Sequence, residues 1–541
     1  MRDGAVLYEQ VPLRIVNDIT ITFVVLALVV ALFVIGRIPV GIIAIGTALA
    51  LYATGVITME QALAGFGDPT VVFIAALFVV SEALDATGVT TWAGEKLLAK
   101  VGESRVRLLS AIMLLVAALT ALISVNGAVA ALVPMVVVLA VRLGKSTSQL
   151  LLPLAFAAHA GSMLTLTGTP VNIIVSEAAE ESGAGAFGFF SFTLVGAPLV
   201  LGTIAIAVLL GPHVLPHRAG TSMSPDLSRH AKTLAKQYQL MGRDAPSAEP
   251  LITKHDGVVE VIIPPRSEMI GDRAFPGMVT DSGDLVILAV QRAGEDCGPN
   301  GVKLAAGDTL LLQGSWDDLD THTAVDPNVL VVDAPGQIRK QAAPLGTRAV
   351  IALVVVAAMV VMLTFGLVPS AIAGLLAACA MVLLRVISVE QAHRSISWTT
   401  LILVGGMIPL STAIQQTGAA EKLAHAFVDV VGGASPYVVV AGLFVVTATL
   451  GQLISNTATA LIITPIAISV AGELDISVLP LLMTVTVAAA ASFLTPVATP
   501  ANMMVMGPGG YKFGDYWKLG LPMLLWFLVV ATVLIPVIWS F

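Results

Sequence analysis

Long apolar stretches recur along the whole chain and leave few alternatives for its fold. About ten of them, between Ile19 and Trp539, are roughly 17 to 20 residues long, the length at which an α-helix crosses a hydrocarbon core of about 30 Å. Only 11% of the 541 residues are charged. Because a soluble protein of this composition would lack a polar surface, the sequence predicts an α-helical, multi-pass protein of the cell membrane, in contact with lipid.

Two parts of the sequence resemble each other at an offset of 330 residues. The segment VITMEQA at 56–62 parallels VISVEQA at 386–392, and TPVN at 169–172 parallels TPAN at 499–502. Polar and proline positions match as well as apolar ones, which composition alone does not explain. We therefore predict two repeats, each with about five transmembrane helices and one re-entrant hairpin. An odd number of crossings requires the second repeat to be inverted relative to the first, as in many secondary transporters.

Loop charges predict the orientation of these repeats. Lys and Arg accumulate in cytoplasmic loops. If the region after the first repeat is cytoplasmic, the inner loops hold most of the cations, and the outer loops hold acidic residues such as Glu177, Glu181 and Glu473. Arg2 and Arg14 fit this assignment less well, because it places both ends of the chain outside.

The composition changes abruptly between His213 and Gly346, where charged residues and short alternating strands replace the apolar runs. We divide the chain into a first membrane repeat (1–212), a linker with a small α+β cytoplasmic insert (213–345, core about 251–333) and a second membrane repeat (346–541).

Two segments of the insert, VEVIIPPRS at 259–267 and AGDTLLLQG at 306–314, resemble the C-terminal domain of TrkA-type potassium-conductance regulators. The resemblance implies a cytoplasmic module that dimerises or binds a small-molecule regulator. A stabilising spacer without a ligand is the alternative. No glycine-rich phosphate-binding fingerprint precedes these segments, so we do not infer dinucleotide binding.

Four predicted helix breaks fall inside apolar segments: the hairpin tips 124–127 and 455–458, and the interrupted crossings 165–170 and 495–500. Such breaks are tolerated at membrane depth only where they line a cavity or are buried in protein. Their hydroxyl and amide side chains can donate hydrogen bonds to an anion, helix N-termini add partial positive charge, and freed carbonyls can bind a small cation. A single Ser or Thr more often bonds its own helix backbone, but a fourfold pattern predicts a binding site between the repeats.

The triplet Ser455-Asn456-Thr457 and the Thr499-Pro500 break resemble the paired Ser-Asn-Thr and Thr-Pro signatures of the divalent anion:sodium symporter family. This resemblance spans both repeats. It implies a homodimer, an elevator-type motion, and transport of a dicarboxylate, citrate or sulfate with sodium ion. The substrate contacts that it implies are Ser124, Asn126, Thr169, Ser455, Asn456, Thr457 and Thr499, and the implied sodium ligands are Asn126, Gly127, Gly168, Asn456 and Ala498.

The first hairpin tip departs from the family signature. Val125 stands where the second tip has Asn456, and an apolar side chain cannot bind a cation. Either Asn126 takes over this role from the next position, or the first sodium site is weakened or absent. His159 lies on a helix with few polar residues, and we expect a packed, hydrogen-bonded side chain there.

The sequence therefore predicts sodium-coupled symport of a small divalent anion. A cation/proton antiporter, a proton-coupled anion transporter of the same superfamily and a gated channel are the alternatives. An antiporter would need a buried carboxylate at the breaks, and the four segments contain none. We expect neither enzymatic activity nor a nucleic-acid partner, because no nucleophile, metal cluster or phosphate loop is evident.

Overall fold

The computed structural model describes residues 6–89, 92, 104–143, 145–218, 256–280, 282–292, 295–297, 301–315, 318–319, 322, 328–331, 346–431 and 435–541. The predicted linker around 221–250 and parts of the predicted insert core lie outside the described residues. The chain forms two compact units, one of residues Met1–Asp85, Ala93–Met223 and Arg348–Phe541, the other of Ala86–Trp92 and Ser224–Thr347.

The first half of the larger unit consists of helices. They are α1 (Val6–Ile35), α2 (Val40–Ala53), α3 (Met59–Ala64), η1 (Gly65–Gly67), α4 (Pro69–Ala86), α6 (Arg105–Thr120), α7 (Val125–Arg142), η2 (Thr147–Gln149), α8 (Leu151–Gly161), η3 (Leu166–Gly168), α9 (Pro170–Glu181) and α10 (Thr193–Val214).

The second half follows a similar order. Its helices are α14 (Thr347–Thr364), α15 (Ser370–Leu383), α16 (Val389–Ser395), α17 (Trp398–Gln416), α18 (Ala419–Val431), α19 (Pro436–Gly451), α20 (Asn456–Glu473), α21 (Val478–Ala490), α22 (Pro500–Gly509), η4 (Phe513–Asp515), α23 (Tyr516–Val529), η5 (Val530–Leu534, a π-helix) and α24 (Ile535–Ile538).

Local structure recurs at the sequence offset of 330 residues. Helices α2 and α15 begin one residue after Pro39 and Pro369, respectively. Helices α3 and α16 both begin with a capping box, in which Thr58 or Ser388 caps the helix and a glutamine three residues later bonds back to the capping residue's N–H. The proline and capping residues that recur 330 positions apart thus start corresponding helices in the two halves.

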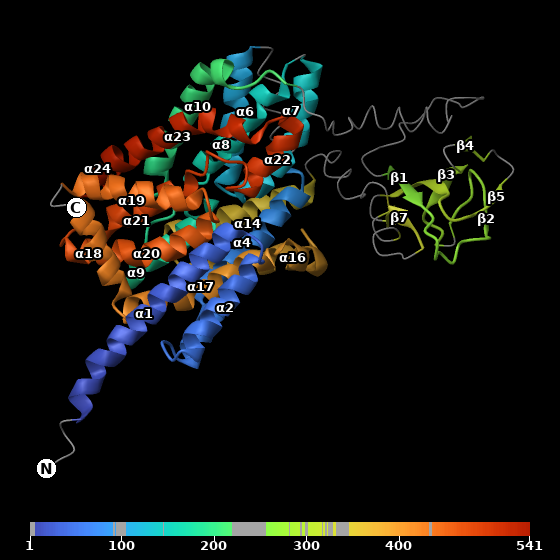
Figure 1. Cartoon of the computed structure of the whole chain (residues 1–541). Coiled ribbons are helices and arrows are strands. Elements are labelled where there is room, and N and C mark those ends of the chain that lie inside the picture. The colour runs from blue at the N-terminus through green and yellow to red at the C-terminus, as the bar shows by residue number, and fades with distance from the viewer. Residues whose placement is uncertain are drawn as a thin grey trace. The chain divides into compact units, whose positions relative to one another are not determined.

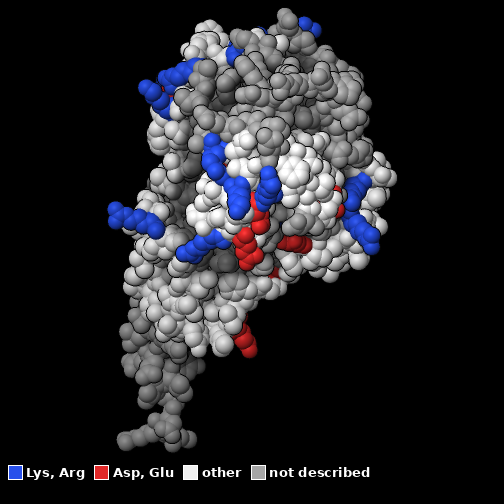
Figure 2. Space-filling model, turned by 90° about the vertical axis from the view of Figure 1, so that its right-hand side faces the viewer, with Lys and Arg blue, Asp and Glu red and all other residues white. Residues whose placement is uncertain are grey.

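Six described helical segments are long and apolar enough to cross a membrane: Asp18–Ile35, Met59–Ala86, Thr193–Val214, Thr347–Thr364, Trp398–Gln416 and Phe513–Ile538. Shorter apolar helices accompany them, among them α2, α15 and α21. In Figure 2 the described Lys, Arg, Asp and Glu side chains gather in the upper and central part of the face, and the described atoms below them are almost all uncharged. These findings confirm the predicted fold class, an α-helical multi-pass membrane protein; five crossings in each repeat stay a prediction.

Helices of the two halves interleave within the larger unit. Helix α2 packs against α17, and α8 packs against α22, so that first-half helices in blue and teal contact second-half helices in orange and red (Figure 1). Helix α9 likewise contacts α20 and α21. The packing therefore brings segments of the two halves into direct contact where the predicted site residues lie.

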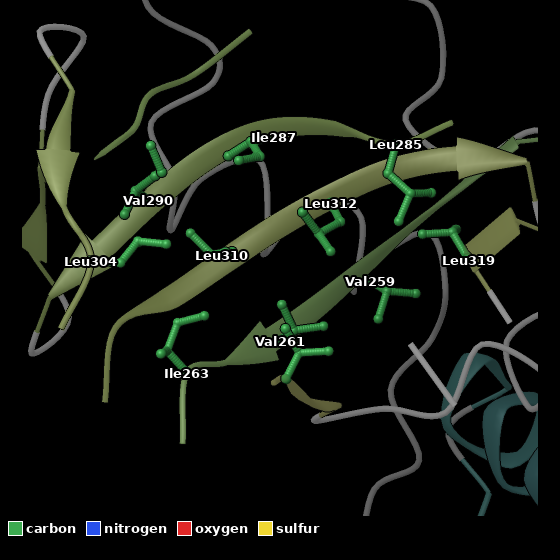
Figure 3. Close-up of a cluster of buried hydrophobic side chains, with 12 residues drawn as sticks. Val259, Val261, Ile263, Leu285, Ile287, Val290, Leu304, Leu310, Leu312 and Leu319 are labelled. Atoms are coloured by element: carbon green, nitrogen blue, oxygen red, sulfur yellow. The ribbon is translucent and has the colours of Figure 1, made fainter. Parts of the chain in front are cut away.

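The smaller unit contains an antiparallel sheet with the strand order β4-β3-β6-β1-β7. The strands are β1 (Asp256–Ile262), β3 (Val286–Arg292), β4 (Glu295–Asp296), β6 (Thr309–Ser315) and β7 (Leu330–Val331), and a separate pair joins β2 (Arg273–Ala274) to β5 (Val302–Lys303). Alternate side chains of β1, β3 and β6, including Val259, Val261 and Leu310, pack on one face of the sheet (Figure 3). The predicted small insert with strands is thus present.

An ion pair between Arg292 and the buried Asp308 closes the end of this sheet. Arg292 donates from Nε to Asp308 Oδ1 and from Nη2 to Asp308 Oδ2, each over 2.7 Å, and the Ala305 N–H donates to Oδ2. The side chain of Asp308 is 1% exposed, whereas that of Arg292 is 46% exposed. The hydrogen bonds from Arg292 hold the pKa of Asp308 below its usual value of 3.8.

Asp308→Ala should therefore lower the free energy of unfolding of the insert by about 1 to 3 kcal/mol at pH 7, since hydrogen bonds to a charged group are lost. A depressed carboxyl pKa contributes stability above its unfolded-state value, and this contribution is lost as the pH falls through the folded-state value. Hydrogen exchange of the β6 amides in the full chain measures the effect, with the exposed Glu268→Ala as control. Equal exchange rates in the Asp308→Ala and Glu268→Ala variants at pH 7 would show that Asp308 does not stabilise the insert.

Candidate anion and cation site

The four predicted helix breaks are present in the structure. In the first half, the chain breaks between α6 and α7 and between α8 and α9; in the second half, it breaks between α19 and α20 and between α21 and α22. Four helices, α7, α9, α20 and α22, therefore begin at these breaks. The N-terminus of each helix carries free N–H groups and partial positive charge, which favour a nearby anion.

A hydroxyl group of the predicted site bonds to the first turn of each of these four helices. Ser124 accepts from the Gly127 N–H (3.1 Å), and Thr169 from the Val171 N–H (3.4 Å). Ser455 and Thr499 accept from the N–H groups of Ala458 and Asn502, each over 3.3 Å. In these four bonds the hydroxyl oxygen is only an acceptor, so its own O–H proton is not used by the cap.

Two buried asparagines, outside the predicted site, brace the interrupted crossings. Asn172 Nδ2 donates to the carbonyls of Ser162 (2.9 Å) and Thr165 (2.8 Å). Asn502 Nδ2 donates to the carbonyls of Ser492 (2.8 Å) and Thr495 (3.1 Å), so the same pattern recurs 330 residues later. Both side chains belong to residues that are 0% exposed. The amides satisfy carbonyls that the missing helical turns leave without a partner.

The second hairpin tip is tied to the second interrupted crossing. The Ser492 hydroxyl donates to Asn456 Oδ1 over 2.7 Å. Gln452, at the end of α19, donates to the Ala491 carbonyl (2.9 Å) and accepts from the Leu494 N–H (3.0 Å). These bonds hold the Ser455-Asn456-Thr457 tip beside the segment that leads to Thr499.

The first tip lies against the first interrupted crossing in the same way. The hydroxyls of Thr165 and Thr167 both donate to the Ala121 carbonyl at the end of α6. A pocket at this contact is lined by Ser81, Ser124, Thr167 and Gly168 together with apolar side chains. Ser81, on α4, was not predicted; only its contact with the tip across the fold reveals it. Asn126 is exposed at the start of α7.

Close packing requires glycine at position 168, independently of its predicted role as a sodium ligand. A Cβ atom there would lie 2.2 Å from the Ser162 carbonyl oxygen, inside van der Waals contact. Any larger residue would therefore push the break apart. At Gly127 the nearest atom to such a Cβ is the Ser124 hydroxyl, at 3.1 Å.

Oxygen atoms suited to a small cation are more evident in the second half. Sodium prefers carbonyl and amide oxygens, and Asn456 Oδ1 and the Ala498 carbonyl belong to segments that the bonds above hold together. In the first half, Val125 supplies no such oxygen at the matching position. Among the described residues, the buried Oδ1 atom of Asn172 has no hydrogen-bond partner, whereas the side chain of Asn502 faces His159.

Comparison with known proteins identifies relatives along the whole chain. The sequence profile of the citrate transporter family (CitMHS) matches residues 30–472 and 431–541. An Escherichia coli protein described as the uncharacterized transporter YfbS is 30% identical, over 95% of this chain and 98% of its own length. A probable sodium/sulfate cotransporter 3 of Chlamydomonas reinhardtii is 29% identical over 30% of this chain and 18% of its own length. The sodium-dependent dicarboxylate transporter SdcS of Staphylococcus saprophyticus is 34% identical over 23% of this chain and 24% of its own length.

Asn502→Ala and Asn172→Ala should each destabilise the protein by about 1 to 3 kcal/mol, because each leaves two buried carbonyls without their donor. The melting temperature of the purified protein in detergent, without substrate, measures this. Asn126→Ala, at an exposed amide, is the matched control and should melt like the wild type. Unchanged melting of the Asn502 variant would show that water replaces the amide at no cost.

Proposed function

Since the chain belongs to the citrate transporter family and is a membrane transporter, not an enzyme, we propose that it carries a small divalent anion together with sodium. The proposed substrates are dicarboxylates, citrate and sulfate. These share the property that matters here, two or more negative charges on oxygen atoms within a few ångströms.

The observation that carries this proposal is the set of four capped helix starts. Ser124, Thr169, Ser455 and Thr499 each keep a hydroxyl proton beside a helix N-terminus, and none of these side chains is charged. A site of this kind binds a divalent anion through hydrogen bonds and helix dipoles. Because the four break segments contain no arginine or lysine, a bound anion could also be released on the other side of the membrane.

The names of two relatives support sodium as the coupling ion. A Chlamydomonas protein is called a probable sodium/sulfate cotransporter and a Staphylococcus protein a sodium-dependent dicarboxylate transporter. We assign the second sodium position to Asn456 and the Ala498 carbonyl, and the first to Asn126, Gly127 and Gly168. Asn456 would then contact both ions, with its Nδ2 toward the anion and its Oδ1 toward the cation.

The remaining assignments rest on the two family resemblances. We propose that the repeats 1–212 and 346–541 are inverted, that Asn126 and Thr457 complete the anion contacts, and that the protein is a homodimer with an elevator-type motion. The insert within 213–345 is proposed to be a cytoplasmic TrkA-C-like domain that responds to a small regulator. Its separate sheet and core, with strands between Asp256 and Val331, are compatible with an independently folded module.

Proton coupling is the second candidate, and one pocket favours it. Asp68, Glu177 and Glu181 line a cavity of about 130 Å³ between α4, α9, α17 and α20. Helices α9 and α20 both begin at the proposed anion site and both line this pocket, so a proton bound there could be linked to the anion. The residues that line the pocket do not belong to the four breaks, which is why we rank proton coupling behind sodium coupling.

Uptake by proteoliposomes separates the candidates. Labelled sulfate, succinate and citrate are offered with an inward sodium gradient, with an inward proton gradient and with neither. We expect sodium to drive uptake of at least one of the three anions. Uptake driven by protons alone would favour the acidic pocket, and a conductance without gradient-driven accumulation would favour a channel.

Asn456→Ala should damage transport more than Asn126→Ala, because Asn456 is tied to Ser492 within an intact triplet whereas Asn126 is exposed behind Val125. Loss of a hydrogen bond to a charged group costs about 1.5 to 3 kcal/mol, or about a 10- to 150-fold weaker affinity. Sodium titrations at fixed substrate, on protein shown to be folded by chromatography, measure both variants. Equal losses in the two variants would mean that the tips are equivalent.

The insert should face the cytoplasm and the residues near both chain ends should face outward. Single cysteines at the exposed positions Glu268 and Ser540, in a chain with Cys297 and Cys379 replaced by serine, test this with an impermeant thiol reagent. We expect labelling of intact cells at position 540 only, and labelling at both positions after permeabilisation. The opposite pattern in intact cells would reverse the orientation.

A further inference from the structure

A histidine of the first half touches the second half of the site. His159 lies on α8, is 2% exposed, and its Nε2 is 3.1 Å from the Thr499 hydroxyl oxygen. Its ring packs edge-on against Phe493, with 6.0 Å between the ring centroids and 78° between the planes. The imidazole is thus held between a buried aromatic ring and a residue at the start of α22.

The bond from His159 affects what Thr499 can do for an anion. The Thr499 oxygen already accepts from the Asn502 N–H, which leaves it one further lone pair and one O–H proton. If Nε2 carries a proton, it donates to that lone pair and the O–H proton stays free for the anion. If Nε2 is bare, the O–H proton bonds to the ring instead and is lost to the anion.

The first half lacks this arrangement. The residue 330 positions after His159 is Ala489, on α21, which is fully buried and has no hydrogen-bonding side chain. Helix α21 packs against α9 as α8 packs against α22, so Ala489 occupies the related contact. Position 489 therefore offers Thr169 no imidazole, and the two threonines differ in this partner as well as in the N–H group that each accepts.

We propose that His159 is a positioning residue for the anion: its Nε2–H donates to Thr499 and directs the Thr499 hydroxyl proton toward the substrate. This proposal rests on the proposed function, in which Thr499 contacts the anion. The anion would then bind more tightly to Thr499, at the second Thr-Pro break, than to Thr169, at the first, although both breaks carry the same Thr-Pro pair. It also assigns the first half of the chain a part in the second half of the site.

Substitutions of His159 in the full-length protein test this. His159→Leu keeps apolar volume but removes the donor, and it should raise the KM for the transported anion about 3- to 10-fold, the cost of one hydrogen bond. His159→Gln retains an N–H donor and should recover most of the affinity. The maximal rate and the melting temperature of the Gln variant should stay near the wild-type values.

A double-mutant cycle supplies the matched control, because Thr499 and Thr169 are equivalent in the repeats. His159→Leu should cause no further loss of substrate binding in a Thr499→Ala chain but its full loss in a Thr169→Ala chain. Binding is measured by protection of the protein against thermal unfolding with added sulfate, succinate or citrate.

The outcomes separate this inference from the proposed function. If the wild type neither binds nor transports any of the three anions, the proposed function fails, and this inference fails with it. If the wild type binds one of them and His159→Leu leaves its affinity unchanged, only the positioning role is overturned. Equal losses in the Leu and Gln variants, or additive losses with Thr499→Ala, would likewise reduce His159 to a packing residue.

Discussion

The structure depends on how the backbone carbonyl and N–H groups at the helix breaks find hydrogen-bond partners inside a membrane. An open carbonyl in hydrocarbon costs several kcal/mol, so a break needs a polar partner from the protein itself. Asn172 and Asn502 provide it, each with one amide that bridges two carbonyls across a gap in the helix. Once these carbonyls are satisfied, the chain can begin new helices at Pro170 and Pro500.

The proposed recognition of an anion without charged side chains would suit a transporter. An arginine in the site would bind a divalent anion tightly and would itself be costly to bury when the anion leaves. Capping hydroxyls and helix N-termini would avoid this cost, because they carry no full charge. A cation bound nearby would then supply the missing positive charge only while it is present, which is a physical basis for coupling the two ions.

The membrane unit and the insert rely on different forces. In the larger unit, apolar residues face outward as well as inward, and close approach of small residues joins the helices, as where Gly65 meets the backbone of Gly405. The insert has an ordinary hydrophobic core, with Val259, Val261 and Leu310 on one face of its sheet and an ion pair to a buried aspartate at its end. A change in the insert therefore need not disturb the packing of the helices.

The sequence by itself determined the membrane fold, the positions of the four breaks and the small inserted sheet. These follow from local rules: apolar length, Thr-Pro helix starts and alternating strands are all written in neighbouring residues. The site residues at the breaks could be proposed for the same reason, since the repeat marks them twice. Only the tertiary structure decided which segments meet. The hydrogen bond between His159 and Thr499 joins residues 340 positions apart, and the contact of Ser81 with Ser124 joins α4 to the first hairpin tip. The packing of interleaved halves sets these contacts, and no local pattern records which buried side chains that packing brings within hydrogen-bond distance.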